Sequence, residues 1–140
     1  MLIHPLSNQL SVTAQIEAVD VATLAAKGFR SIINNRPDGE SGDQPSSAIL
    51  AAAAKKAGLD YRYIPVVSGQ LQQAQVQAFE SALSEMSAPV LAFCRTGTRS
   101  STLWALQAAG TADAILASAS AAGYDLSALR PHLGDAAHGH

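Results

Sequence analysis

Short apolar runs alternate with segments of helical periodicity along this chain. The alternation is typical of an α/β domain with a largely parallel sheet, because parallel strands need long crossover connections that are usually helices. We therefore expect a central, mostly parallel sheet of about four or five strands flanked by helices. The expected strands are Gln9–Val12, Phe29–Asn34, Tyr61–Val67 and Val90–Phe93.

Helices are expected in the connections. The first should begin at an N-cap on Thr13 and end at Gly28, with a buried side formed by Ile16, Val19, Val21 and Leu24. The remaining helices are expected from Ser46 or Ser47 to Gly58, across Val76–Met86, from Ser100 or Ser101 to Ala109, near Thr111–Ala122 and near Leu126–His132. Residues 35–45 lack periodic apolar positions and predict a long loop.

Composition indicates one ordinary globular domain. The chain has 140 residues, 48% of them hydrophobic, and a net charge of −2. We expect a single domain over residues 1–140, with its core at about 7–133 and a frayed tail at 134–140. Without a basic tract, binding to nucleic acid or to an anionic membrane surface is not expected.

The same features give expectations for location and metal content. The chain has no run approaching about 18 apolar residues, and Met1–Leu10 lacks the features of a signal peptide, so a cytoplasmic protein is expected. The single cysteine, Cys94, cannot form an internal disulfide or a cysteine-based zinc site. His4 and His132 are isolated in the sequence. We expect neither a metal nor a cofactor.

The most informative segment is the run Phe93-Cys94-Arg95-Thr96-Gly97-Thr98-Arg99-Ser100, in which an apolar strand ends, a short loop closes and a helix begins. Backbone N–H groups in such a loop can converge, and the helix N-terminus adds about half a positive charge. The segment therefore predicts a small anion-binding cradle. Cys94 is the candidate nucleophile, because the helix dipole and Arg99 both favour its thiolate.

Neighbouring residues are candidates for holding the anion or the sulfur. Arg99 can present a planar fork to two oxygens, and Ser100 can hydrogen-bond the sulfur, so both join Cys94 as candidate catalytic residues. Arg95 either steers anions at the rim or is a solvated surface charge, and Arg36 either forms a second wall or only pairs with an acidic residue. The candidate binding residues are Arg95, Thr96, Gly97, Thr98 and Arg36.

These residues carry a family resemblance. Cys94–Ser100 resembles the active loops of cysteine-dependent phosphatases, including the dual-specificity class, and of rhodanese-type sulfurtransferases. Over about residues 7–125 the chain resembles the bacterial beta-lactamase-hydrolase-like, phosphatase-like domain family. The segments that carry this wider resemblance are Ser31–Asp38, Pro45–Ser47, Tyr63–Val66 and Cys94–Trp104. The resemblance implies a dual-specificity-phosphatase-like fold and an activity described either as phosphatase-like or as sulfurtransferase.

Two departures from the phosphatase pattern favour sulfur transfer. That pattern has one residue more between Cys and Arg and usually a His before the Cys, whereas four residues separate Cys94 from Arg99 and Phe93 precedes them. The shorter loop is similar to that of rhodaneses. Residues 68–73 also supply no acid to protonate a leaving group. Three acids of the long loop could substitute only if it folds over the cysteine: Asp38, Glu40 and Asp43.

The preferred hypothesis is thus a rhodanese-like sulfurtransferase. The Cys94 thiolate would take a sulfane sulfur from thiosulfate or a persulfide, and an acceptor thiolate would then remove it from the Cys94 persulfide. One alternative is a cysteine-dependent phosphatase of tyrosine or dual-specificity type, acting through a Cys94 phosphocysteine. A second is a non-catalytic anion-binding or sensor module. The expected partner is in each case a small anion: thiosulfate, a persulfide or a phosphomonoester.

Overall fold

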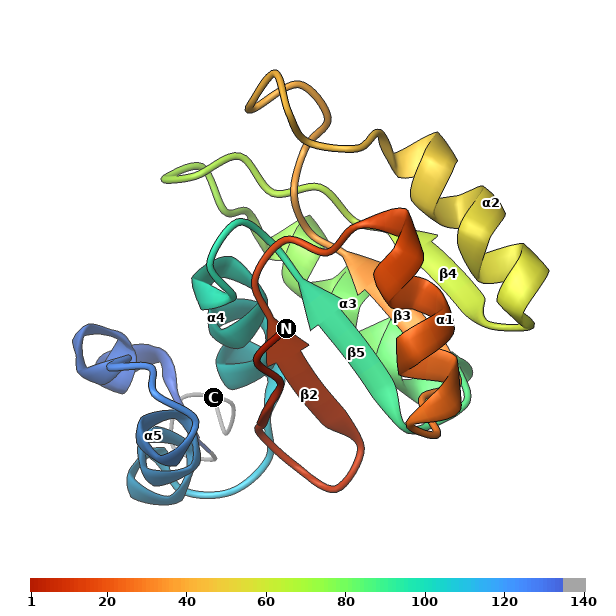
Figure 1. The fold of residues 1–140 in the computed structure, drawn as a ribbon. Helices are drawn as coiled ribbons and strands as arrows, with labels where there is room; N and C mark the ends of the chain where they lie inside the picture. The colour runs from red at the N-terminus through yellow and green to blue at the C-terminus, as the bar shows by residue number, and fades with distance from the viewer. Residues whose placement is uncertain (135–140) are drawn as a thin grey trace.

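A computed structural model describes residues 1–134 of the chain. In this part five strands form one sheet in the order β1-β2-β5-β3-β4 (Figure 1). β1 (His4–Pro5) pairs antiparallel with β2 (Leu10–Thr13), and the other neighbouring pairs, among β2, β5 (Val90–Phe93), β3 (Ser31–Asn34) and β4 (Asp60–Tyr63), are parallel. The expected mostly parallel α/β sheet is confirmed, with β1 as an added edge strand.

Helices cover both faces of the sheet (Figure 1). α1 (Ala18–Ala26) and α2 (Ser47–Ala57) pack on one face, and α3 (Gln73–Glu85) and α4 (Thr98–Gln107) pack on the other. α5 (Ala112–Ala121) lies beside α4 and is followed by the short 3₁₀ helix η1 (Ser127–His132). The result is a three-layer arrangement with a core on each side of the sheet.

The alternation of side chains along the strands creates these two cores. Ile32, Leu91 and Phe93 point into the core shared with α1 and α2, whereas Ile33 and Ala92 point into the core shared with α3, α4 and α5. Because β3 and β5 are central strands, all their residues are buried. Their carboxyl ends, where the candidate site lies, are therefore held by buried strands that pair on both sides.

The start of the first helix differs from the prediction. Thr13 is not an N-cap, because it belongs to β2 and pairs there with Phe93 of β5. α1 begins later, after a capping box in which Glu17 and Asp20 exchange hydrogen bonds with each other's backbone N–H groups. With this start Val19 faces solvent at 79% exposure, so the prediction that it is buried was wrong. The predicted end at Gly28 agrees with the structure to within a residue or two.

Other element boundaries are shorter or shifted. The strand expected at Phe29–Asn34 is β3, which begins only at Ser31, and the strand expected at Tyr61–Val67 is β4, which covers Asp60–Tyr63. α4 begins at Thr98 rather than at Ser100 or Ser101. α2 has the predicted N-cap, in which Ser46 Oγ accepts from the Ile49 N–H, 3.2 Å apart. The last expected helix is a 3₁₀ helix. The predicted frayed tail lies almost entirely outside the described residues.

Candidate functional site: the loop between β5 and α4

The candidate nucleophile lies where β5 ends. Cys94 directly follows β5, and Asn35 and Arg36 directly follow the neighbouring strand β3, so all three meet at one edge of the sheet. The two segments are also joined by the Asn35 N–H, which donates to Phe93 O over 2.8 Å. Parallel β5 and β3 thus bring together residues that are far apart in sequence, as is usual for sites at the carboxyl ends of strands.

The loop after Cys94 closes on the sulfur. The backbone N–H of Gly97 donates to Cys94 Sγ, 3.1 Å away. Gly97 adopts a φ of 95°, which an L side chain rarely adopts, and it is the N-cap of α4. Thr96 and Thr98 are linked through their hydroxyl oxygens at 3.0 Å, which braces the loop. Cys94 is fully buried in this state.

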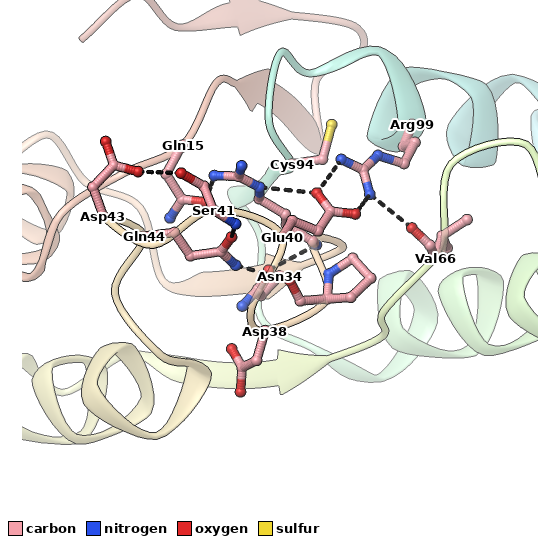
Figure 2. A network of polar contacts seen from close by, with 12 residues as sticks. Gln15, Asn34, Asp38, Glu40, Ser41, Asp43, Gln44, Val66, Cys94 and Arg99 are labelled. Carbon is pink, nitrogen blue, oxygen red and sulfur yellow. Dashed lines mark hydrogen bonds and ion pairs between the residues drawn. The ribbon is translucent and has the colours of Figure 1, made fainter.

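Arg99 lies in the first turn of α4, and its positive charge interacts with the Cys94 sulfur. Its Nη1 and Nη2 donate to the two carboxylate oxygens of Glu40 over 2.7 and 2.8 Å, and Nη1 also donates to Val66 O over 2.8 Å (Figure 2). The Glu40 carboxylate raises the pKa of Arg99, and Cys94 adds to this effect. Arg99 is therefore positioned between an acidic side chain and the candidate nucleophile.

Arg36 approaches the same carboxylate from the β3 side. Its Nε donates to Glu40 Oε1 over 3.0 Å and its Nη1 donates to Gln15 Oε1 over 3.1 Å. Arg36 pairs with an acid and also lines the pocket beside the loop, and its role in holding an anion stays a prediction. Hydrogen bonds and charge from Arg99, and secondarily from Arg36, lower the pKa of Glu40.

Ser100 was expected to hydrogen-bond the Cys94 sulfur, but the structure gives its hydroxyl another partner. Its hydroxyl donates to Asn35 Oδ1 over 2.8 Å, and Asn35 Nδ2 donates to Ile64 O over 2.9 Å. Both hydrogen bonds are in the buried interior, where an amide side chain left without partners would be costly. Ser100 thus joins the start of α4 to the ends of β3 and β4, and its contact is structural in this state.

An open pocket of about 640 Å³ lies beside the loop. Arg95 is exposed at its rim and also borders a smaller adjoining hollow. Cys94 does not line the pocket, because it lies beneath the surface. The lining residues are all polar: Arg36, Glu40, Ser41, Ser68, Arg95, Thr96, Thr98 and Arg99. Three arginines therefore line one space, which suits an anionic ligand.

Of the three acids in the long loop, only Glu40 pairs with Arg99 and lines the pocket, whereas Asp43 borders the adjoining hollow. Asp38 Oδ1 instead accepts from the Ser47 N–H over 2.8 Å at the start of α2. Asp43 is exposed and accepts from the Ser41 hydroxyl. Through Glu40 the long loop reaches Arg99 at the start of α4.

Tyr124 is a neighbour of the site that no sequence pattern indicates. Its hydroxyl donates to Thr96 O over 3.1 Å, so a residue after α5 supports the Cys94 loop. Burial, and then the charge of Cys94, raise the pKa of Tyr124. A lone tyrosine in an aperiodic segment carries no local signal of such a contact, which depends on how α5 packs beside α4.

The described residues offer neither a metal cluster nor a membrane span. Residues 1–134 contain no group of three or more histidine, cysteine, aspartate or glutamate side chains placed to hold a metal ion. Within the same range no helix has the length and apolar character needed to cross a bilayer.

Comparison with known proteins places this site in a family context. Residues 3–111 match the family described as beta-lactamase hydrolase-like protein, phosphatase-like domain. A beta-lactamase hydrolase-like protein of Xylella fastidiosa is 39% identical over 106 residues, which cover 76% of this chain and 25% of that protein. The chain thus corresponds to about a quarter of the length of this curated relative.

Solved structures agree in fold. A crystal structure of a Neisseria meningitidis protein, provisionally described as a phosphatase, has 34% identity and a TM-score of 0.81 and covers 93% of this chain and 94% of that one. TpbA of Pseudomonas aeruginosa, solved with phosphotyrosine, has 18% identity and a TM-score of 0.56 and covers 94% and 70% of the two chains, which shows the fold alone. The fold is thus that of cysteine-dependent phosphatases, and the chain belongs to the beta-lactamase hydrolase-like, phosphatase-like domain family.

Proposed function

We propose that the chain is a cysteine-dependent phosphatase that hydrolyses a small phosphomonoester through a phosphocysteine on Cys94. The observation that carries the proposal is the position of Cys94 in a loop that the Gly97 N–H closes onto the sulfur, beside a pocket lined by three arginines. A phosphoryl group in transfer spreads negative charge over three oxygens, and arginines are suited to hold them. Membership of a phosphatase-like family adds support.

The reaction needs two displacements. The Cys94 thiolate forms an S–P bond while the ester P–O bond breaks, and the departing oxygen takes the electron pair. Water then attacks phosphorus, the S–P bond breaks, and the thiolate is regenerated with release of inorganic phosphate. Arg99 would bind two phosphoryl oxygens with its fork, and the Gly97 N–H would steady the sulfur. Because the arginines lower the pKa of Glu40, its carboxylate carries no proton to give to the departing oxygen. Esters whose leaving group has a low pKa, such as aryl phosphates, are therefore favoured.

Sulfur transfer, which the sequence pattern favoured, has less support. The comparisons support the phosphatase alternative rather than a sulfurtransferase. One specific observation keeps it as the second candidate: only four residues separate Cys94 from Arg99. In that reaction the S–S bond of thiosulfate breaks, Cys94 takes the sulfane sulfur, and sulfite leaves with the electron pair.

Parallel assays separate these candidates. We expect the purified chain to hydrolyse an aryl phosphate, and Cys94→Ser to abolish this turnover. The matched control is Arg130→Lys, whose exposed ion pair with Asp113 lies away from the site. Transfer of sulfur from thiosulfate to cyanide without phosphate release would reject the proposal in favour of the second candidate. Neither activity, with inorganic phosphate still bound, would instead indicate a non-catalytic anion-binding module.

A further inference from the structure

Glu40 fills the position that a bound anion needs. Its two carboxylate oxygens accept from the two terminal nitrogens of Arg99 over 2.7 and 2.8 Å, in the fork arrangement used for carboxylates and phosphates. Arg36 donates to the same carboxylate over 3.0 Å. Figure 2 shows the Glu40 carboxylate facing the Arg99 guanidinium. The donors expected to hold a phosphoryl group are therefore already occupied by a side chain of the chain itself.

The state is also closed at the nucleophile. Cys94 is fully buried and does not line the pocket, although Arg99 lines the pocket and interacts with the sulfur. An anion that passes from this pocket to the sulfur therefore meets the Arg99 guanidinium. Since Arg99 cannot give the same two N–H groups to Glu40 and to the ligand, the two must compete.

Glu40 lies where it can yield without unfolding the loop. The loop is fastened on both sides of Glu40, because Asp38 accepts from the Ser47 N–H and the Gln44 side chain donates to Pro37 O. The Glu40 side chain is 24% exposed, and it borders the open pocket. A rotation of this one side chain toward water would therefore free both arginines while its neighbours stay in place.

We propose that Glu40 is a specificity-determining residue that acts as an internal competing anion, so that only a group carrying two negative charges, such as a phosphomonoester dianion, displaces it efficiently. This inference rests on the proposed function only for the role of Arg99 in binding the anion. Small monoanions gain too little from the two arginines to replace a carboxylate that is already held in place. Neutralising Glu40 should thus open the site to weaker anions.

The first test measures anion binding without turnover. Glu40→Gln should bind inorganic phosphate at least about fivefold more tightly than the wild type by calorimetry, because charge-assisted hydrogen bonds to Arg99 no longer have to be broken. Glu85→Gln makes the same change at an exposed ion pair with Arg62, outside the lining of the pocket, and should leave the affinity unchanged. Equal or weaker phosphate binding by Glu40→Gln would overturn the inference.

The second test uses the single cysteine as a reporter. Alkylation forms an S–C bond on Cys94 with loss of iodide, and the reagent is either anionic iodoacetate or neutral iodoacetamide. Glu40→Gln should raise the rate with iodoacetate several-fold relative to the rate with iodoacetamide, and Glu40→Asp should give a smaller rise. A loosened loop would raise both rates equally, and that result would contradict the inference even if the variant were less stable.

The outcomes also separate this inference from the proposed phosphatase activity. If the wild type hydrolyses aryl phosphate but Glu40→Gln shows no gain in phosphate affinity, the inference fails and the function stands. If Glu40→Gln gains affinity but no variant hydrolyses a phosphate ester, the function fails and the competing role of Glu40 stands. A drop in turnover of esters with poor leaving groups, with unchanged phosphate affinity, would make Glu40 a proton donor instead and reject the inference.

Discussion

Replacing Gly97 with alanine should disturb the Cys94 loop in two separable ways. Gly97 has a φ of 95°, and holding an L residue in such a conformation costs about 1–3 kcal/mol. A Cβ at this position would also lie 2.1 Å from the Tyr124 hydroxyl oxygen and 2.9 Å from Tyr124 Cζ. With both effects we expect Gly97→Ala to lower the free energy of unfolding by about 2–4 kcal/mol.

The variant should still fold, because a domain of this kind has a stability of about 5–15 kcal/mol. Its activity should fall much further, since the Gly97 N–H that donates to Cys94 Sγ moves when the loop moves away from Tyr124. Urea denaturation measures the first effect, and hydrolysis of an aryl phosphate measures the second.

Two further variants divide the cost into its parts. Gly69 has a φ of 77° with no atom within 4 Å of an added Cβ, so Gly69→Ala should show only the backbone cost. Adding Tyr124→Ala to Gly97→Ala removes the ring that the new Cβ meets, and the two substitutions should couple favourably by about 1–2 kcal/mol. The reasoning is refuted if Gly97→Ala costs no more than Gly69→Ala, or if the double variant is simply additive.

Three further predictions concern the polar contacts of the site. Arg99→Lys should keep the fold but slow aryl phosphate hydrolysis by about 10- to 100-fold, because an ammonium group cannot make the forked contact. Steady-state kinetics measure this loss, with Arg130→Lys as the control variant. Equal losses in the two variants would contradict the prediction. Asn35→Ala should lower stability by about 1–3 kcal/mol in urea denaturation, since the buried Ser100 hydroxyl loses its acceptor; a change within error would count against that network. The arginines lower the pKa of Glu40 in the folded chain below its value in the unfolded chain. The pairing therefore stabilises the fold at pH values above the unfolded pKa, and this stability is lost as the pH falls through the lowered folded pKa. Glu40→Gln should therefore cost about 0.5–1 kcal/mol at neutral pH, where solvent screens the partly exposed pair, and match the wild type in acid; a difference independent of pH would refute this reasoning.

The parts of the site that are contiguous in sequence are predictable. An apolar run, a cysteine, a glycine in a short loop and an arginine at the start of a helix mark a strand–loop–helix segment by local pattern alone. The parallel sheet follows from the alternation of strands and helices. Together these features are enough to place Cys94, Gly97 and Arg99 at the carboxyl end of a central strand.

Contacts made by tertiary closure are not predictable in the same way. Glu40 and Arg99 are 59 positions apart, and nothing in the local pattern tells which of the acids in the long loop turns inward. The local pattern indicates the Cys94 sulfur as the partner of the Ser100 hydroxyl, and only the closeness of β3 to α4 gives Asn35 instead. Thr13 has good capping chemistry, but pairing of its backbone with β5 extends the strand instead.

Direct detection of the covalent intermediate tests the central claim best. Rapid acid quenching during turnover of an aryl phosphate, followed by mass spectrometry, should show the mass of one phosphoryl group on the peptide that contains Cys94, which is the single cysteine of the chain. Cys94→Ser should release no aryl alcohol. Undiminished turnover in Cys94→Ser, or a phosphoryl group found only on another residue, would contradict the role of Cys94 as the nucleophile.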